Sequence, residues 1–167
     1  MTLNLIFAIG TVALQIFVVV LFVNLFYKNN KLASFIKNNF VKLGFAMSVV
    51  AVAVSLTYSV ILGYAPCLFC WWARIFIFPQ LIIFAVAWFK RKNVALEFFI
   101  LSIFGIIVTG YHTFIDFGGS QFIECEAGGV SCLQRYVFEF GYITIPVMAL
   151  TGFVLLAILA TYKLRDK

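Results

Sequence analysis

Four cysteines are the residues with the clearest capacity for chemistry. Cys67 and Cys70 form a Cys-Leu-Phe-Cys motif directly after Pro66, and Cys125 and Cys132 form a second pair. Two thiols separated by two residues are typical of thiol–disulfide redox couples, although metal sites also use this spacing. A disulfide between Cys67 and Cys70 would close a very short loop and would restrain the chain little. The spacing therefore favours a redox couple over a structural cross-link.

The side chain of Arg74 is expected to share a helix face with the first cysteine pair. With about 100° of rotation per residue, Cys67, Cys70 and Arg74 fall within a sector of roughly 60°. The unpaired amide groups and the dipole at a helix start favour a thiolate, and a nearby guanidinium adds to that effect. A lowered thiol pKa makes the thiolate more abundant and a better leaving group.

Arg74 is predicted to lie about 10 Å below Cys67 along the helix axis. A charged residue at that depth in a membrane is costly and marks a functional site. Protein side chains store electrons from a dithiol only as other disulfides, so we interpret Arg74 as a donor to the carbonyl of a membrane quinone. The single histidine, His112, ends an apolar run at the level of the cysteines, and we interpret it as a proton-handling group. The alternatives are an arginine that extends to the lipid headgroups and a structural histidine.

Two other interpretations of the cysteines stay open. They could form two structural disulfides, with three possible pairings, although a membrane bundle needs such cross-links less than a small secreted domain does. They could also bind one zinc ion as four thiolates, but such sites usually combine two close pairs. Six residues separate Cys125 from Cys132, which is looser than that pattern, and we assign no metal ligand.

The composition places these residues in an integral membrane protein. Of the 167 residues, 65% are hydrophobic and 11% are charged, whereas soluble domains are about half apolar and about a quarter charged. The apolar runs are continuous and not alternating, so they predict transmembrane helices. Pro79 and Pro146 fall inside the third and fifth of these, where each predicts a kink. The five predicted spans are Leu3–Tyr27, Leu43–Tyr64, Cys67–Phe89, Val94–Ile115 and Tyr142–Tyr162.

The charges predict which side of the membrane each connection occupies. Ten of the twelve basic residues lie between spans one and two, between spans three and four, and in the C-terminal tail. The positive-inside rule places these segments in the cytoplasm, the N-terminus outside and the C-terminus inside. This clustering accounts for the net charge of +6 without nucleic-acid binding. All four cysteines then face the oxidising side, and none remains to collect electrons from a cytoplasmic donor.

The first span is predicted to be an N-out membrane anchor and not a cleaved signal peptide. It lacks a basic segment ahead of the apolar run and shows no Ala-x-Ala-like site before Lys28. Its positive charge follows the apolar run instead.

The long outer connection, residues 116–141, carries the second cysteine pair. Gly118-Gly119 and Gly128-Gly129 predict that this segment moves, which would help the pair to meet first a soluble partner and then the membrane pair. A set of four larger residues recurs at helical spacing and predicts a short helix in the membrane interface. These four residues are Leu133, Tyr136, Val137 and Phe140.

The combined pattern resembles the DsbB/BdbC family of membrane disulfide-forming proteins. The resemblance covers roughly Val41–Tyr162, and its pieces are specific as a set and not singly. The matching pieces are Cys67 and Cys70 with Arg74, Tyr111-His112, Cys125 and Cys132, and Ile145-Pro146 followed by Met148-Ala149-Leu150.

The resemblance implies a fold and a mechanism. Residues 40–167 would form a four-helix bundle with a redox loop at 116–141, in a bacterial cell (inner) membrane. The bundle would reoxidise a DsbA-like, thioredoxin-like dithiol oxidase and reduce ubiquinone or menaquinone. Cys125 would form the mixed disulfide with that partner, Cys132 would exchange with Cys67, and Cys70 would be the thiolate against the quinone. Arg74 would hold the quinone, with His112 nearby.

Two features depart from the family pattern. Family members often carry Gln or Glu directly before the arginine, where this chain has Ala73 after Trp71-Trp72. The family usually has four spans, so residues 1–39 would add an N-terminal transmembrane helix and a basic linker. The short loop between Cys125 and Cys132 is closer to the BdbC branch.

Overall fold

The computed structural model is a helical protein, and it describes residues 2–26, 31–90, 92–123, 125–127 and 130–165. Five of its helices have the length and the apolar composition needed to cross a membrane. They are α1 (Thr2–Asn24), α2 (Lys31–Leu56), α3 (Leu68–Lys90), α4 (Ala95–Asp116) and α5 (Ile145–Leu164), and α2 continues into a π-helical turn, η1 (Thr57–Ile61). The prediction of an all-α membrane protein with five spans is confirmed.

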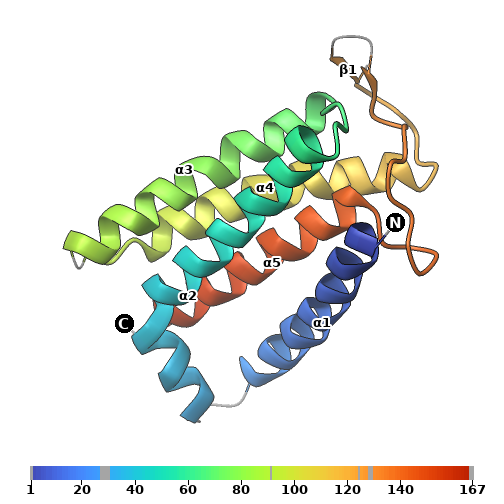
Figure 1. Ribbon diagram of the computed structural model, residues 1–167. Coiled ribbons are helices and arrows are strands. Elements are labelled where there is room, and N and C mark those ends of the chain that lie inside the picture. Colours follow the sequence, from blue (N-terminus) through green and yellow to red (C-terminus); the bar gives the residue numbers. More distant parts are fainter. Residues whose placement is uncertain (1, 27–30, 91, 124, 128–129, 166–167) are drawn as a thin grey trace.

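Helices α2 to α5 form a bundle in which α5 is the most enclosed member (Figure 1). In the most apolar 18-residue stretch of α5, 61% of the residues are buried inside the protein, against 17% in the corresponding stretch of α1. The core at one end contains Phe40 of α2, whose ring centroid lies 5.5 Å from that of Phe84 and 6.2 Å from that of Phe98. Gly44 lets α2 approach α3, because a Cβ atom there would overlap the Phe84 ring. Aromatic side chains from three helices thus fill the space around α5.

Helix α1 packs beside α5 and is tied to it by polar contacts. The Tyr142 hydroxyl, just ahead of α5, donates to Gln15 Oε1 at 2.8 Å, and the Gln15 amide lies 3.3 Å from Thr151 Oγ1. Further along, the buried Tyr162 hydroxyl donates to the Leu21 carbonyl at 2.8 Å. Polar groups inside a bilayer need protein partners, so these contacts fix α1 against α5 along much of its length.

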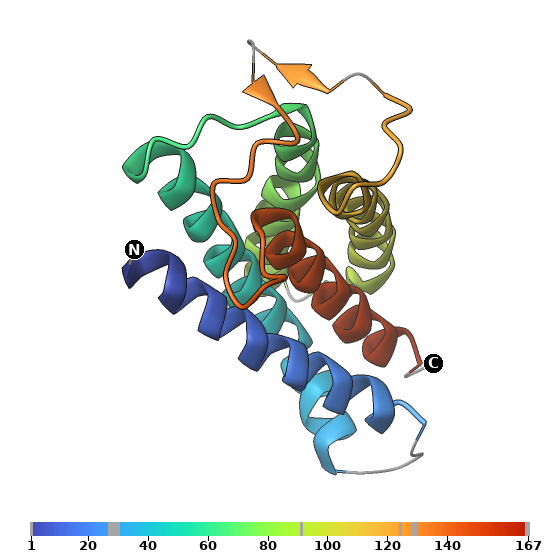
Figure 2. The same cartoon turned by 90° about the vertical axis from the view of Figure 1, so that its right-hand side faces the viewer.

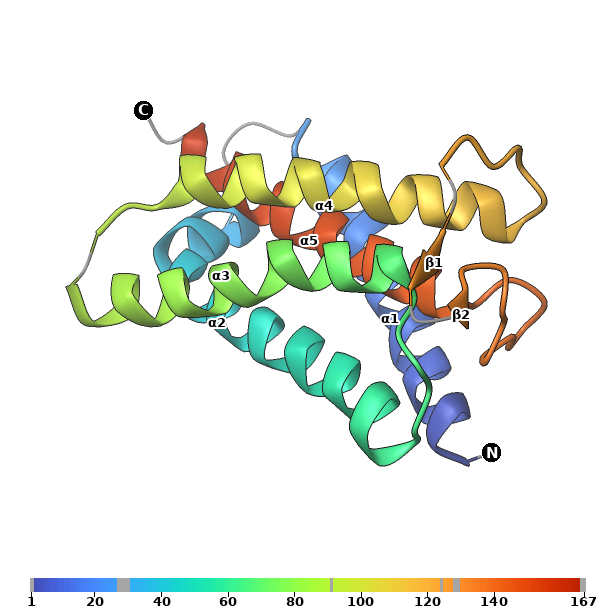
Figure 3. The same ribbon diagram turned by 90° about the horizontal axis from the view of Figure 1, so that it is seen from above.

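The connection after α4 lies at the same end of the molecule as the N-terminus, and the C-terminus lies at the other end (Figure 1). Figure 2 looks onto the end that carries the connection and the N-terminus. This connection contains two short antiparallel strands, β1 (Glu126–Ala127) and β2 (Val130–Ser131). Seen from above, the connection gathers beyond the ends of α3, α4 and α5 (Figure 3). We call this the cysteine end, because all four cysteines lie there.

Most predicted boundaries differ from the observed ones by one to three residues, and two of the differences have a clear physical reason. Helix α2 begins at Lys31, well before the predicted Leu43, because Ile36, Phe40, Gly44 and Ser48 form one buried face at helical spacing although lysines lie between them. Helix α5 begins at Ile145, so Pro146 lies in its first turn. A proline there gives up no helical hydrogen bond, and the predicted kink at Pro146 is wrong. Pro79, where a kink was also predicted, lies inside α3, and the helix continues past it to Lys90.

The predicted interfacial helix at residues 133–140 is also wrong. These residues form turns and a reversal, in which Glu139 and Ile143 make an isolated bridge with N–H···O distances of 3.0 and 2.8 Å. Phe140 and Gly141 have φ angles of 52° and 76°, which a right-handed helix does not allow. Short isolated helices are marginal without tertiary support, and here the chain must instead return to the start of α5.

Candidate functional site

Cys67 stands at the start of α3, where its backbone accepts the first helical hydrogen bond. The amide of Trp71 donates to the Cys67 carbonyl at 3.1 Å. The chain reaches this position from η1 through Gly63, whose φ of 68° allows the reversal. The Cys67 side chain is 4% exposed, and Cys70, one turn later, is half-buried. The placement of the motif at a helix start agrees with the prediction.

The two thiols of this pair are close and share a histidine. The Sγ atoms of Cys67 and Cys70 lie 3.1 Å apart, and Cys67 Sγ lies 3.8 Å from Nε2 of His112. The contact with Cys70 lowers the pKa of Cys67 to about 4, His112 acts in the same direction, and burial opposes both. The reduced pair therefore carries its negative charge on Cys67 at neutral pH.

The second pair forms a disulfide that lies next to Cys67. Cys125 and Cys132 are bonded to each other, and their Cα atoms lie 5.7 Å apart. The strands β1 and β2 run between them, and the Cys132 amide donates to the Cys125 carbonyl at 3.2 Å. The sulfur atoms of Cys67, Cys125 and Cys132 all lie within 4.8 Å of one another. Gly128-Gly129, which were predicted to make this segment mobile, lie outside the described residues.

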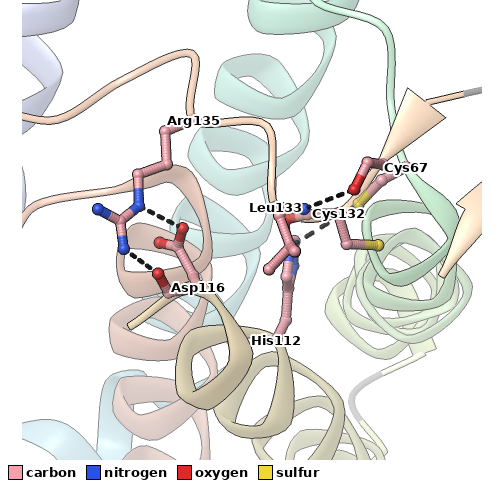
Figure 4. A network of polar contacts seen from close by, with 7 residues as sticks. Cys67, His112, Asp116, Cys132, Leu133 and Arg135 are labelled. Atoms are coloured by element: carbon pink, nitrogen blue, oxygen red, sulfur yellow. Dashed lines mark hydrogen bonds and ion pairs between the residues drawn. The ribbon is translucent and has the colours of Figure 1, made fainter. Parts of the chain in front are cut away.

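Three sulfurs at this separation can exchange disulfide bonds with little movement of the backbone. Exchange proceeds by attack of a thiolate on a disulfide sulfur through a mixed disulfide. His112 contacts both pairs, since its Nε2 is also 3.4 Å from the Cys132 carbonyl oxygen (Figure 4). All of the sequence-predicted cysteines and His112 thus meet at one place.

Two contacts that the sequence analysis missed hold the loop over α4. Arg135 binds Asp116 through Nε and Oδ1 at 2.7 Å and also contacts the Asp116 carbonyl oxygen (Figure 4). The Tyr111 hydroxyl accepts hydrogen bonds from the amides of Phe122 and Ile123 at 2.8 and 3.3 Å. The only available sequence signal was a lone outer arginine together with an aspartate at the end of a span. These contacts anchor the loop on both sides of its disulfide.

The Arg74 side chain points toward α2, where it binds Ser55. Its Nε atom donates to Ser55 Oγ at 3.0 Å, and Nη2 donates to the Ser55 carbonyl at 3.1 Å. Its guanidinium also lies over the Trp71 ring, 5.1 Å from the centroid. Among the described residues these contacts use two of the five N–H donors of the guanidinium. The remaining donors are available to a ligand.

A cavity of about 470 Å³ connects these groups. Its lining includes Cys67, Cys70, Arg74 and His112, and most of the rest is apolar. The predicted face of Cys67, Cys70 and Arg74 therefore borders a single space. An apolar cavity with a few convergent polar groups is typical of a small-molecule site.

Two groups of residues at the site also have ligand atoms within 4.8 Å of one another: Cys67, Cys125 and Cys132, and Cys67, Cys70 and His112. Since Cys125 and Cys132 are bonded to each other, neither offers a thiolate in this state. The four-thiolate zinc arrangement is therefore not formed here.

Comparison with known proteins identifies the family. The model of the family described as "Disulfide bond formation protein DsbB" matches residues 37–163, which include α3, α4, all but the last residue of α5, and all four cysteines. The chain belongs to the DsbB family. A relative from Bacillus subtilis, "SPbeta prophage-derived disulfide bond formation protein B", is 34% identical over 73% of this chain and 82% of its own length. "Probable disulfide formation protein C" from Halalkalibacterium halodurans is 36% identical over 68% of this chain and 84% of its own length. No solved structure gives a significant match.

Membership in the DsbB family confirms the resemblance stated from the sequence and makes the chain a membrane protein of disulfide bond formation. The DsbB match begins inside α2. Helix α1 therefore lies outside the part of the chain that matches the family.

Proposed function

We propose that this DsbB-family protein oxidises an extracytoplasmic, thioredoxin-like dithiol oxidase of the DsbA type and passes the electrons to a membrane quinone. The cysteine end would face the outside of a bacterial cell membrane, with the N-terminus outside and the C-terminus in the cytoplasm. The basic residues at the other end of the helices support this orientation. Residues 40–167 would form the catalytic bundle, and residues 1–39 would form an added element.

The first step would take place at Cys125. A thiolate of the partner attacks Cys125 Sγ, the Cys125–Cys132 bond breaks, and Cys132 leaves as a thiolate. The second thiol of the partner then attacks its own mixed-disulfide sulfur. The partner departs oxidised and leaves both loop cysteines reduced, so two electrons have entered the loop.

The second step would move these electrons to the membrane pair. With Cys67 and Cys70 joined as a disulfide, the Cys132 thiolate attacks Cys67 and Cys70 leaves as a thiolate. Cys125 then attacks Cys132, which restores the loop disulfide and releases Cys67. The observation that supports this step is the distance of at most 4.8 Å between the sulfurs of Cys67, Cys125 and Cys132.

The residues around the cavity fit a quinone. Arg74, fixed by Ser55, would donate a hydrogen bond to a carbonyl oxygen, and Cys70 borders the same space. A bound quinone would accept the two electrons and two protons of the Cys67–Cys70 dithiol. His112, in contact with Cys67 Sγ, would take up or release the proton of that thiol. The family-implied thiolate on Cys70 would arise when Cys67 is bonded to Cys132.

The test is anaerobic mixing of the purified protein with a reduced DsbA-type oxidase and a short-chain ubiquinone or menaquinone, with quinone absorbance as the readout. We expect one quinone reduced for each partner dithiol oxidised. The Cys70→Ser variant should give no quinone reduction, and unchanged activity in this variant would contradict the mechanism. A scaffold with structural disulfides would show no cycling of any cysteine, and a metal protein would contain metal in stoichiometric amount.

A further inference from the structure

Helix α1 contributes to the cavity although it lies outside the family match. The match begins at residue 37, whereas the cavity lining includes Ile6, Phe7, Gly10, Thr11 and Leu14. Positions 6, 10 and 14 are four apart, and positions 7 and 11 lie beside them on the same face, so the five residues form one stripe along α1. The cavity that reaches Cys70 and Arg74 therefore has a wall that the match does not include.

Contacts of α1 with η1, which continues α2, and with Tyr64 set the depth of this stripe. The Asn4 amide lies 3.3 Å from the Tyr64 hydroxyl, and the rings of Phe7 and Tyr58 are 5.4 Å apart. The two helices are therefore antiparallel here. Gly10 follows Phe7 by three residues, and Ser55 precedes Tyr58 by three residues. Both positions therefore lie about 4.5 Å further from the cysteine end than the Phe7–Tyr58 contact. Because Ser55 binds Arg74, Gly10 lies at the depth of the arginine.

The cavity is open between these two helices. Ile6 on α1 and Val50 on α2 both line it, yet their side chains are 60% and 53% exposed. At this depth the medium outside is hydrocarbon. Gly10 is itself exposed, and a Cβ atom added to it would meet nothing within 4 Å. A side chain at this position would therefore occupy the opening and not the packed interior.

We propose that the opening between α1 and α2 is a lateral portal through which quinone enters from the bilayer, and that Gly10 keeps it wide enough. The inference rests on the proposed function. A membrane quinone dissolves only in the hydrocarbon, so its route to Arg74 and Cys70 has to leave from a helix gap below the surface. The apolar rims of this gap suit the ring and tail of the quinone, and the polar groups stand at its inner end.

The test uses the full-length protein in lipid nanodiscs and two narrowing variants, Gly10→Leu on α1 and Val50→Phe on α2. Ala13→Leu is the matched control, because Ala13 is exposed on α1 and does not line the cavity. Binding of decyl-ubiquinone is followed by stopped-flow quenching of tryptophan fluorescence, since Trp71 lies against Arg74. A separate readout without quinone is the reduction of the Cys67–Cys70 disulfide by dithiothreitol, measured by thiol alkylation.

Both narrowing variants should slow quinone association by about tenfold or more, as expected when a larger side chain has to be displaced from the path. Ala13→Leu should bind at the wild-type rate, and all three variants should be reduced by dithiothreitol as the wild type is. Wild-type association rates in both narrowing variants would overturn the portal and indicate that quinone reaches the cavity by another route. Absence of quinone binding to the wild-type protein would instead overturn the proposed function.

Discussion

The Sγ atom of Cys67 lies 3.8 Å from Nε2 of His112, and the two residues come from the facing ends of α3 and α4. His112 also approaches the backbone of Cys132, so a single imidazole contacts both cysteine pairs. The histidine therefore has two roles open to it. It can stabilise the Cys67 thiolate, and it can fix the position of Cys132, which we propose to exchange with Cys67.

The thiolate role predicts a change in titration for His112→Ala. The pKa of Cys67 is lowered from 9.0 to about 4, chiefly by Cys70 and further by His112. The thiolate of the wild-type protein should persist on acidification until the pH falls through that low value. Removing the imidazole should raise the pKa of Cys67 only part of the way toward that of a free thiol, because the contact with Cys70 remains. Ultraviolet thiolate absorbance of the reduced protein measures this, with Cys67→Ser as the blank, and an unchanged titration would contradict the role.

The spacing of the sulfurs predicts a trapped disulfide in Cys70→Ser. This variant leaves Cys67 as a lone thiol within 4.8 Å of both loop sulfurs, so it should attack the loop disulfide and free one of those cysteines. Peptide mapping under non-reducing conditions should then find Cys67 joined to Cys125 or Cys132. Cys67→Ser is the control and should retain only Cys125–Cys132. A Cys70→Ser protein with Cys67 still free would show that the pairs do not meet.

The clamp between Arg135 and Asp116 gives a third prediction. Arg135→Ala leaves the carboxylate of Asp116, which is 3% exposed, without its ion-pair partner, and we expect a loss of about 1–3 kcal/mol in the free energy of unfolding. Arg135→Ala with Asp116→Ala should be more stable than Arg135→Ala alone, because no charge is then left buried. Thermal unfolding in detergent measures the cycle. Additive losses from the two single substitutions would show that the pair is not coupled.

Much of the site followed from local spacing in the sequence. The motif at Cys67 and Cys70 places both thiols at a helix start, and Arg74 follows one turn later on the same face, so helix geometry alone brings them to one cavity. His112 was placed at the correct level because it ends a span of membrane length. These predictions needed only the rise and rotation of a helix and the thickness of a bilayer.

The parts that failed depend on contacts between distant segments. The stretch of residues 133–140 has helical spacing, but Arg135 binds Asp116 and the chain reverses at Phe140, and no local pattern encodes either event. The basic stretch after Lys31 was excluded from the second span by its charge, although its buried face continues that helix. The wall that α1 gives the cavity depends on how α1 packs on α5, which the sequence alone does not specify.

The contact between Ser55 and Arg74 gives the last prediction. Ser55 accepts from Arg74 with its side chain and with its backbone. The Ser55→Ala variant removes only the first of these hydrogen bonds. The guanidinium should therefore be held less firmly but should remain bound to the backbone carbonyl. We expect quinone affinity to fall by about threefold to tenfold, which matches the net contribution of one hydrogen bond. Arg74→Ala should lower the affinity further, because it removes the hydrogen-bond donor that we propose for the quinone.

The control for this prediction is Thr57→Val, since Thr57 is partly exposed at the start of η1 and its hydroxyl donates to the Ala53 carbonyl one turn earlier. Fluorescence quenching by decyl-ubiquinone measures the affinity of all three variants, and reduction by dithiothreitol checks that their cysteines still react. If Ser55→Ala binds quinone as the wild type does while Arg74→Ala does not, the backbone carbonyl is enough to orient the arginine. If neither variant changes the affinity, Arg74 serves only to join α3 to α2, and the quinone has to be held by other residues of the cavity.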